Sequence, residues 1–457
     1  MVIQITNQRD FAFKGYIFIY LGLWYAISVY LEICWSTIWH PADQRLLFTL
    51  HSYVDERSFK LTQNEFKNFE EYLIAVRELS QNVLRPAENR LTRENGIPDD
   101  LTAALTDIGL FGISIPKEFG GFGFSMEQQV RLTFEFCQAS CVYRSRFSTT
   151  IGLTSQAILD FATEEQKDRY LPKMASGQCT GAFALTETEA GSDASALTTT
   201  AKKNGNKGWL LNGEKRYITN APQADVFLVM AKTEENAAGS SGISAFLVDA
   251  DQPGITVGEP PKMLGNEGSH ACYVWFNDCQ VPFEALIGGV EGRGLKAALR
   301  GINHARLHVA ATCVGQAIRL IDEMTSYASK RQQFGKSIGE FGQIQALLAD
   351  SQSEMSAGKA LCLDCAKKFD EGAEIPFIDI ASAKLFCSEM VSRVADRAVQ
   401  VMGGLGYMED MSDVPRLFRD VRLFRIFEGA SQIQQTNIAK AMLKNTRSHS
   451  ATSPIKP

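Results

Sequence analysis

Apolar residues recur at helical spacing in the part of the chain that follows residue 60. The positions from Phe66 to Leu79 repeat every three or four residues, behind a segment Leu61-Thr62-Gln63-Asn64-Glu65 that suits a helix cap. Pro86 and Gly96-Ile97-Pro98 interrupt the pattern. We predict a helical domain over residues 59–178, with further helices over 101–110, 126–137, 151–161 and 164–174.

The pattern changes at Cys179 to short β-prone runs separated by Gly, Asn, Pro and Asp. Asn212-Gly213 is a residue pair typical of a hairpin turn. No helical segments alternate with these runs, and no glycine cluster has the G-x-G-x-x-G spacing of a dinucleotide-binding turn. We therefore predict a β domain over residues 179–290, with strands over 180–185, 208–211, 226–232, 244–248, 255–257 and 272–276.

Long helical stretches return after the glycine-rich loop at 288–294. Short Gly and Pro breaks between such helices indicate an antiparallel bundle, predicted over 291–447 and followed by a tail at 448–457. The predicted fold is α+β and multidomain: an N-terminal helical domain, a middle antiparallel β domain and a C-terminal four-helix bundle. The bundle helices are predicted over 295–329, 341–369, 378–402 and 414–424, with a fifth after residue 428.

Residues 1–58 do not share these patterns. The run from Tyr16 to Leu31 is uncharged, and only Glu32 interrupts the apolar character up to Trp39. Its many aromatic residues suit a membrane interface better than a bilayer core, and no small-residue cleavage site marks a secretory signal. Three interpretations stay open: a membrane-associated helix over 16–39, a buried segment, or an upstream extension that does not belong to the working protein.

Composition places the chain among globular proteins. Of its 457 residues, 45% are hydrophobic and 21% charged, which is enough for a sizeable core. A net charge of −6 without a long Lys/Arg run argues against a nucleic-acid partner. Ten cysteines are scattered, and Cys362-x-x-Cys365 lies in a predicted helix without a second pair or a nearby His. We predict no metal site and a reducing compartment.

A candidate general base lies near the end of the chain. Glu428 follows the apolar Phe427 and precedes Gly429-Ala430-Ser431, which has the character of a helix start. Apolar surroundings remove hydration from a carboxylate and raise its pKa, as proton abstraction requires. An acid at a helix start can equally do no more than complement the helix dipole. The local sequence leaves both interpretations open.

Four separated motifs together resemble the acyl-CoA dehydrogenase family. Their order and spacing match that family over about residues 60 to 445, as does the order helical, β, helical. The resemblance implies a FAD-dependent enzyme. The four segments are Ala182-Phe183-Ala184-Leu185-Thr186-Glu187-Thr188-Glu189-Ala190-Gly191-Ser192-Asp193, Tyr217-Ile218-Thr219-Asn220, Arg331-Gln332-Gln333-Phe334-Gly335-Lys336 and Phe427-Glu428-Gly429-Ala430-Ser431-Gln432-Ile433-Gln434.

The first two motifs would hold the flavin ring. By the resemblance, Phe183, Leu185 and Thr186 line the isoalloxazine, and Gly191 and Ser192 lie at the junction of flavin and CoA. Thr188-Glu189 stands where the family has Pro-Gly. In the second motif Tyr217 replaces a Trp whose ring covers the flavin, Ile218 follows, and the Thr219 hydroxyl would bond flavin N5.

The third motif would reach the FAD pyrophosphate and adenine of a neighbouring subunit through Arg331, Gln333 and Phe334. An arginine has the fork geometry that phosphate favours. Its Phe-Gly variant resembles the very-long-chain branch. The loop Gln400-Val401-Met402-Gly403-Gly404 resembles a segment that approaches the adenosine part of FAD, where small residues allow close approach. A homodimer or homotetramer is implied.

The fourth motif matches the family's catalytic base to Glu428. Some relatives place that base just before an arginine on an earlier helix, which here is Ala305 before Arg306, so Glu428 has no rival. The resemblance places Ser192, Asn303, Arg306, Phe427 and Gly429 beside the substrate. Residues lining both substrate and flavin would be Gly429, Ala430, Ser431 and Gln432.

The implied reaction is α,β-dehydrogenation of a fatty acyl-CoA to the trans-2-enoyl-CoA, a step of fatty-acid β-oxidation. Glu428 would take the α-proton, flavin N5 would accept the β-hydride, and an electron-transfer flavoprotein would take the electrons in a bacterial cytoplasm or a mitochondrial matrix. Two alternatives stay open: an oxidase or monooxygenase that uses oxygen, and a flavin-free scaffold on the same fold. Acyl chain length, branching and any aromatic or dicarboxylic preference are not given by the sequence.

Overall fold

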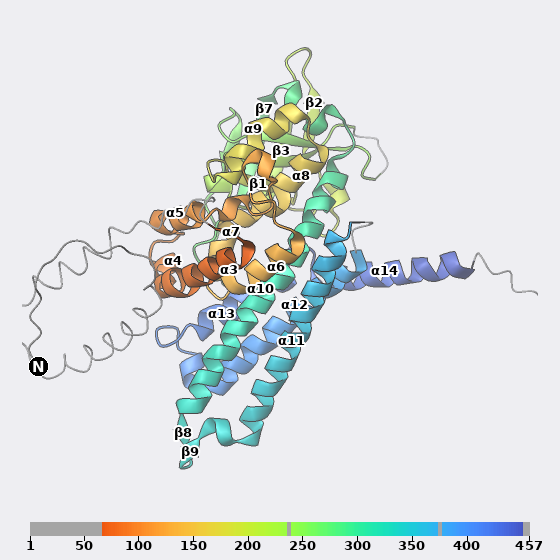
Figure 1. Cartoon of the computed structure of the whole chain (residues 1–457). Helices are drawn as coiled ribbons and strands as arrows, with labels where there is room; N and C mark the ends of the chain where they lie inside the picture. Colours follow the sequence, from red (N-terminus) through yellow and green to blue (C-terminus); the bar gives the residue numbers. More distant parts are fainter. Residues whose placement is uncertain (1–65, 235–238, 373–376, 451–457) are drawn as a thin grey trace, which may run out of the picture. The chain divides into compact units, whose positions relative to one another are not determined.

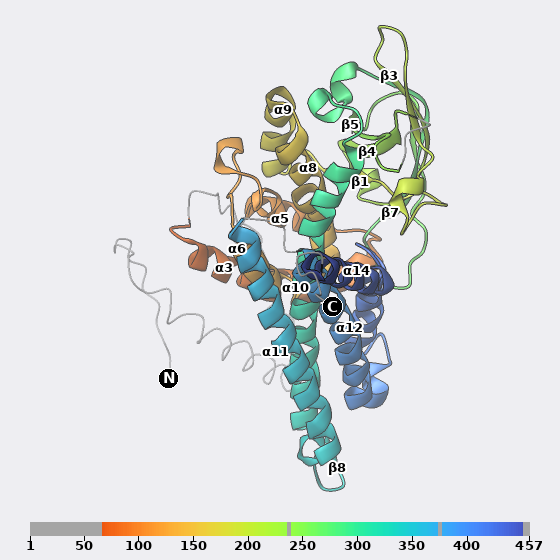
Figure 2. The same ribbon diagram turned by 90° about the vertical axis from the view of Figure 1, so that its right-hand side faces the viewer.

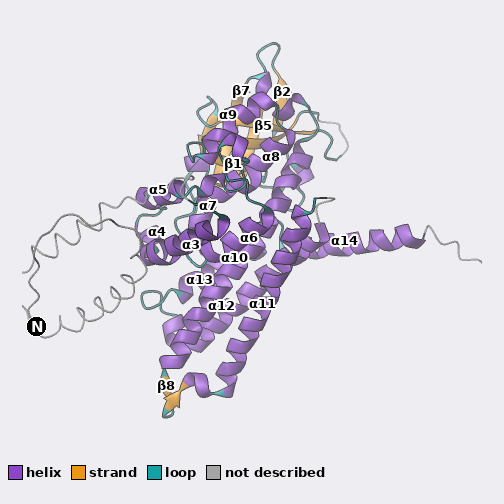
Figure 3. Cartoon of the chain, viewed as in Figure 1, coloured by secondary structure: helices purple, strands orange, loops and turns teal. Residues whose placement is uncertain are grey.

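The computed structural model describes residues 66–234, 239–372 and 377–450, with side chains up to residue 444 in the last helix. A helical region, a β region and a second helical region follow one another (Figure 1), which confirms the predicted fold. The strands of the β region gather at one end, and the remainder of the described chain is mainly helical (Figure 3). The apolar segment 16–39 lies outside the described residues; among those described, no helix is long and apolar enough to cross a membrane.

The N-terminal region consists of short helices with defined starts. The helix that begins at Phe69 is capped by Asn68, whose side chain accepts from the Glu71 amide; the predicted start at 61–65 lies outside the described residues. An unpredicted helix follows residue 140, and most of its residues are buried, so it lacks an amphipathic pattern. The helices are α3 (Phe69–Glu78), α4 (Asn89–Arg93), α5 (Asp99–Asp107), α6 (Met126–Phe136), α7 (Cys141–Thr149), α8 (Ser155–Phe161) and α9 (Glu164–Ala175).

The β region is one mixed sheet. The pairs β2–β3, β3–β7, β4–β5 and β6–β7 are antiparallel, whereas β1–β4 and β2–β4 are parallel, so the sheet is not purely antiparallel as predicted. The long chain between β1 and β4 makes a parallel pair possible without a hairpin. The strands are β1 (Gly181–Ala184), β2 (Thr200–Lys203), β3 (Trp209–Thr219), β4 (Val226–Lys232), β5 (Ile243–Asp249), β6 (Ile255–Val257) and β7 (Ala271–Val281).

The hairpin turn predicted at Asn212-Gly213 is wrong. Both residues lie inside β3, where the pairing with β7 shifts register between Leu211 and Gly213. A Cβ on Gly213 would lie 2.4 Å from the hydroxyl oxygen of Thr199, so only glycine allows the two segments to approach. The pair therefore marks a β-bulge instead of a turn, which is the other common use of a strand glycine.

Long helices form the C-terminal region, close to the predicted bounds. α10 packs against α11 and α12, and α11 lies alongside both (Figure 2). Met126, Val130 and Phe134 of α6 join the apolar core of this bundle, which fixes the N-terminal region on it. The elements are α10 (Gly294–Lys330), β8 (Gln332–Gln333), β9 (Lys336–Ser337), α11 (Gly342–Asp370), α12 (Phe377–Met402), α13 (Val414–Val421) and α14 (Ser431–Ser450).

Candidate active site

Glu428 lies on the short segment between α13 and α14, and three side chains hold its backbone. Arg306 Nε of α10 donates to the Glu428 carbonyl oxygen at 3.0 Å, and Lys384 Nζ of α12 donates to the Gly429 carbonyl oxygen at 2.8 Å. The buried amide of Gln434 donates to the same two oxygens at 3.1 and 3.0 Å. These donors take up the carbonyl groups and leave the carboxylate to other partners.

The surroundings of Glu428 give its carboxyl group a pKa suited to a general base. Burial raises the pKa of its carboxyl to about 7, although the positive charges of Arg306, Lys384 and Arg144 work in the opposite direction. No hydrogen bond or ion pair reaches this carboxylate from the described parts of the chain, and its own backbone N–H has no acceptor there. A pKa near neutrality is suited to proton abstraction, and a free N–H is suited to an oxyanion.

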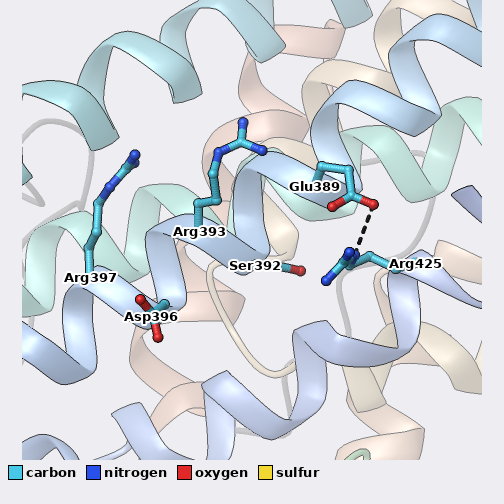
Figure 4. Close-up of a pocket in the computed structure, with 6 residues that line it drawn as sticks. All are labelled: Glu389, Ser392, Arg393, Asp396, Arg397 and Arg425. Atoms are coloured by element: carbon cyan, nitrogen blue, oxygen red, sulfur yellow. Dashed lines mark hydrogen bonds and ion pairs between the residues drawn. The ribbon is translucent and has the colours of Figure 1, made fainter.

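The start of α14 is fixed by Glu389 of α12. Its Oε1 accepts from the Ser431 hydroxyl at 2.6 Å and from Arg425 Nε at 2.9 Å, so it ties both sides of the Glu428 segment to one helix. Figure 4 shows the bond between Glu389 and Arg425 at the edge of a charged pocket. That pocket is not the candidate active site, since Glu428 does not line it; its lining residues are Glu389, Ser392, Arg393, Asp396, Arg397 and Arg425.

The predicted flavin loop is joined to β3 by a buried ion pair. Lys215 Nζ lies 2.7 Å from Glu187 Oε1, and both side chains are almost fully buried. Lys215 also donates to the Leu185 carbonyl oxygen at 3.2 Å, and the Arg216 amide donates to that of Thr186 at 2.8 Å. The loop that follows β1 is thereby held against the strand that carries Tyr217, Ile218 and Thr219.

Left-handed backbone conformations mark the predicted site residues. Seven non-glycine residues in the described chain have positive φ, and four of them are Asn or Asp, which tolerate it. The other three are Tyr217 (φ 59°), Phe334 (φ 54°) and Glu428 (φ 51°). Such strain concentrates at functional sites. All three were singled out from sequence motifs that are far apart in the chain.

Tyr217 and Phe334 present aromatic rings to the surface. Their exposed fractions are 57% and 92%, and the Arg216 guanidinium lies over the Tyr217 ring at 4.6 Å. Exposed flat rings, and the arginine beside Tyr217, suit a planar, phosphate-bearing cofactor such as FAD. Phe183 and Thr186 are half-buried, Leu185 is buried, and Ile218 points into the sheet core; Gly191 and Ser192 are exposed.

The arm with Arg331, Gln333 and Phe334 lies far from Glu428 in the same chain. It follows the end of α10, at the opposite end of the bundle from the sheet (Figure 1). Arg306 and Arg331 are separated by about 38 Å along a helix that rises ~1.5 Å per residue. The end of α12 is likewise distant, since Gln400 lies about 24 Å along the helix, at ~1.5 Å per residue, from Lys384, which bonds to Gly429. The predicted residues there are Gln400, Val401, Met402, Gly403 and Gly404. One chain therefore does not bring the two sets together.

Sequence reasoning missed three residues that surround Glu428. Lys384 and Gln434 hold its backbone, and Arg144 of α7 contributes to its electrostatics. A signal existed for Lys384, which lies among the apolar positions of α12 and is completely buried. Of the predicted substrate residues, Asn303 accepts from Arg306 NH1 at 2.8 Å, so it orients the arginine that holds Glu428.

An oxidoreductase of the flavin-dependent type is the class that this fold and site define. The family models of acyl-CoA dehydrogenase match its N-terminal domain at residues 68–178, its middle domain at 182–279 and its C-terminal domain at 292–443. The chain belongs to the acyl-CoA dehydrogenase family.

Curated relatives include an acyl-CoA dehydrogenase of Bacillus subtilis (strain 168), 36% identical over 81% of this chain and 97% of the relative. Subunit CarC of the caffeyl-CoA reductase-Etf complex of Acetobacterium woodii is 36% identical over 81% of this chain and 95% of its own length.

Two solved structures extend these likenesses. The glutaryl-CoA complex of a glutaryl-coenzyme A dehydrogenase has a TM-score of 0.78 and 32% identity, over 83% of this chain and 96% of that one. The FAD complex of PigA has a TM-score of 0.78 and 27% identity, over 82% and 98%.

Proposed function

We propose that the protein catalyses FAD-dependent α,β-dehydrogenation of an acyl-CoA thioester to the trans-2-enoyl-CoA, with Glu428 as the base. The observation that carries this proposal is the environment of Glu428. Two cations bind the backbone of its segment, whereas its carboxylate has no hydrogen-bond or ion-pair partner in the described chain, and burial raises the pKa of that carboxyl to about 7. An acid that caps its helix would have its carboxylate bonded to the first helix amides, and Glu428 makes no such bond among the described residues.

The chain's own groups account for the acid–base part of the reaction. The Glu428 carboxylate takes the proton from the α-carbon, and the free Glu428 N–H donates to the thioester oxygen as negative charge develops on it. Arg306, Gln434 and Lys384 fix the segment that carries both groups, so little reorganisation is needed. FAD, when bound, supplies the acceptor for the two electrons lost from the β-carbon.

The cofactor would be held by groups from two copies of the chain. Phe183, Leu185, Thr186, Tyr217, Ile218 and Thr219 would adjoin the flavin ring, and Arg331, Gln333 and Phe334 of a second copy would take the pyrophosphate and adenine. The distance between these sets along α10 favours this division and, with it, a homodimer or a dimer of dimers. An electron-transfer flavoprotein is the proposed acceptor, in line with the Etf complex to which the Acetobacterium relative belongs.

Glu428→Gln tests the proposal directly. The amide keeps the size of the side chain but cannot take the proton, so we expect flavin content and acyl-CoA affinity to be retained and turnover to fall by about three orders of magnitude or more. The assay is anaerobic reduction of the bound flavin by an acyl-CoA panel. Near-normal reduction in the variant would overturn the base assignment, and a colourless protein would favour the scaffold. Rapid reoxidation of the reduced flavin by oxygen would favour the oxidase.

A further inference from the structure

Arg144 is a buried cation without a partner. It lies on α7, and 9% of its surface is exposed. The other two buried arginines of the described chain, Arg306 and Arg319, make hydrogen bonds or ion pairs, whereas none is found for the Arg144 side chain. Burying an unpaired charge is costly, so such a group is expected to have a counter-charge in the working state.

The surroundings of Arg144 contain a second unsatisfied group, His304 of α10. Its ring is 4% exposed and its Nδ1 has no hydrogen-bond partner among the described residues. A Cβ on Gly152, in the π-helical turn Thr150–Thr154, would lie 3.6 Å from that nitrogen. The neighbouring His308 contacts Gln129 at 3.0 Å, so the two adjacent imidazoles, whose ring planes are tilted by 36°, differ in this respect.

The charges of the cluster do not balance. Arg144, Arg306 and Lys384 act on Glu428 together, and the other carboxylate that acts on Lys384, that of Glu389, is already bonded to Arg425 and Ser431. Arg306 and Lys384 donate to the backbone oxygens of Glu428 and Gly429. Burial keeps both histidines neutral at physiological pH, with the pKa of His304 lowered to about 3. Arg144 is therefore the one cation of these three whose side chain is bonded to no oxygen atom of the described chain.

We infer that Arg144, together with His304, binds a carboxylate at the far end of the acyl chain, so that the substrate is the CoA monothioester of a short dicarboxylic acid. This inference rests on the proposed function, because it takes Glu428 as the group beside the thioester. The phosphates of CoA are separated from the thioester by the pantetheine arm. An anion that reaches a buried cluster together with Glu428 thus belongs to the acyl part.

An unsubstituted hydrocarbon tail fits this cluster poorly. It would exclude water from the guanidinium and offer no hydrogen-bond acceptor in return. A carboxylate accepts two parallel N–H bonds from an arginine, and the neutral imidazole of His304 has a nitrogen available as a further donor. The same buried charge that makes the protein less stable without substrate becomes a source of discrimination when the diacid binds.

The test compares pairs of thioesters matched in length: glutaryl-CoA with valeryl-CoA, and adipyl-CoA with hexanoyl-CoA. We expect the wild type to show a kcat/KM at least about 10-fold higher for the better diacid ester than for its partner. Arg144→Met is expected to lower that ratio by about 10- to 100-fold, mainly through KM for the diacid, and Arg144→Lys to restore part of it. Equal ratios in wild type and Arg144→Met would overturn the inference.

Arg146→Met is the matched control, since it removes the same charge from the same helix. Arg146 already has partners, the Thr180 hydroxyl at 2.8 Å and the Phe111 ring at 5.4 Å, so this change should leave the ratio as in the wild type. Thermal stability gives a second readout. Arg144→Met should melt at the same temperature as the wild type or higher, whereas a structural role for Arg144 would lower it and leave the ratio unaltered.

Failure of the inference can be told from failure of the proposed function. Turnover of valeryl-CoA above glutaryl-CoA, and of hexanoyl-CoA above adipyl-CoA, would overturn the inference and leave the function standing. If no thioester reduces the flavin, the increase in melting temperature on adding each thioester decides. A larger increase with glutaryl-CoA or adipyl-CoA than with the matched ester would support the carboxylate site, provided that the difference is lost in Arg144→Met. Equal shifts would overturn it.

Discussion

The Nζ atom of Lys384 lies 2.8 Å from the carbonyl oxygen of Gly429, the residue that follows the proposed base. Lys384 itself is completely buried in α12, and burial lowers the pKa of its ammonium group to about 8. The free energy gained from one bond to a backbone oxygen is small compared with the cost of desolvating the ammonium group, so Lys384 is not expected to contribute to stability. Its position instead fixes the Glu428 segment and adds a positive charge near the carboxylate.

Removal of this charge should shift the pH profile of the enzyme. Glu428 must be deprotonated to act as a base, so kcat/KM should rise with pH through about 7 in the wild type. In Lys384→Met the cation that lowers the Glu428 pKa is gone, and the rising limb should move to higher pH. Lys367→Met, on the exposed side of α11, is the control and should leave the limb in place. An unshifted limb in Lys384→Met would contradict the electrostatic role.

Glu428→Gln should change stability in a pH-dependent way. The folded-state pKa of about 7 lies above the usual 4.5, so the folded protein binds the proton more tightly and loses stability as pH rises through this window. The glutamine variant lacks this loss. We expect its unfolding free energy to exceed that of the wild type by up to about 3 kcal/mol at pH 8 and by much less at pH 5.

Glu389→Gln provides a control of opposite sign. Although burial works to raise the Glu389 pKa, the bonds from Ser431 and Arg425 hold it below its usual value. This carboxylate therefore stabilises the folded protein above the unfolded pKa and loses its contribution as pH falls. Glu389→Gln should be destabilising at pH 8 and less so at low pH. Denaturant titrations at both pH values check both variants, and parallel curves for the two would refute the assignments.

Lys215→Met should weaken both the β domain and flavin retention. Although burial works to raise the Glu187 pKa, Lys215 and the bonds from Thr198 and Thr199 hold it at about 2, so Lys215→Met removes the main interaction that keeps this buried acid charged. A buried charge without its partner costs about 3–5 kcal/mol. Glu187→Gln together with Lys215→Met should cost less than Lys215→Met alone. Flavin absorbance after gel filtration and chemical unfolding measure the two effects.

The matched control for Lys215 is Lys203→Met on β2. Lys203 pairs with Glu291 at 2.7 Å, but both side chains are largely exposed, so the change should cost less than about 1 kcal/mol. Full flavin retention in Lys215→Met would show that the ion pair does not determine the geometry of the loop that follows β1 and carries Leu185 and Thr186.

Sequence patterns were sufficient where local chemistry decides the structure. The periodic apolar positions of α10, α11 and α12 predict helices because one face of each packs in the bundle core. α7 was missed because it is buried on nearly all sides, and Asn212-Gly213 was misread because a bulge and a turn use the same residues. Both errors arise from tertiary contacts that no local window contains.

The residues of the candidate site likewise fall into those that the sequence identifies and those that only the fold reveals. Glu428 and the aromatic Tyr217 could be found because motifs carry them, and their strained backbones agree with the choice. Arg144 and Lys384 come from other helices and meet Glu428 only in the folded chain. A charged residue within an apolar helical segment was the available signal for Lys384, whereas Arg144 lies on α7, which the pattern did not predict. The contact of each residue with Glu428 could be identified only from the folded structure.

Glu88 should be decisive for the attachment of the N-terminal region to the bundle. Its carboxylate accepts from Arg319 NH1 of α10 at 2.7 Å, from the Ser140 amide at 2.5 Å and from Arg416 of α13, and it is 2% exposed. Glu88→Gln leaves the buried Arg319 and the partly buried Arg416 short of a counter-charge, so we expect a loss of about 3–5 kcal/mol in unfolding free energy. Glu135→Gln, which breaks a more exposed ion pair with Arg77, should cost under about 1 kcal/mol.

The number of unfolding transitions should change as well. The Glu88 network joins the N-terminal helices to the bundle, and we expect the wild type to unfold in a single transition. In Glu88→Gln the N-terminal helices should unfold before the bundle, so that two transitions appear. A single, unshifted transition followed by circular dichroism and by flavin fluorescence would contradict this role.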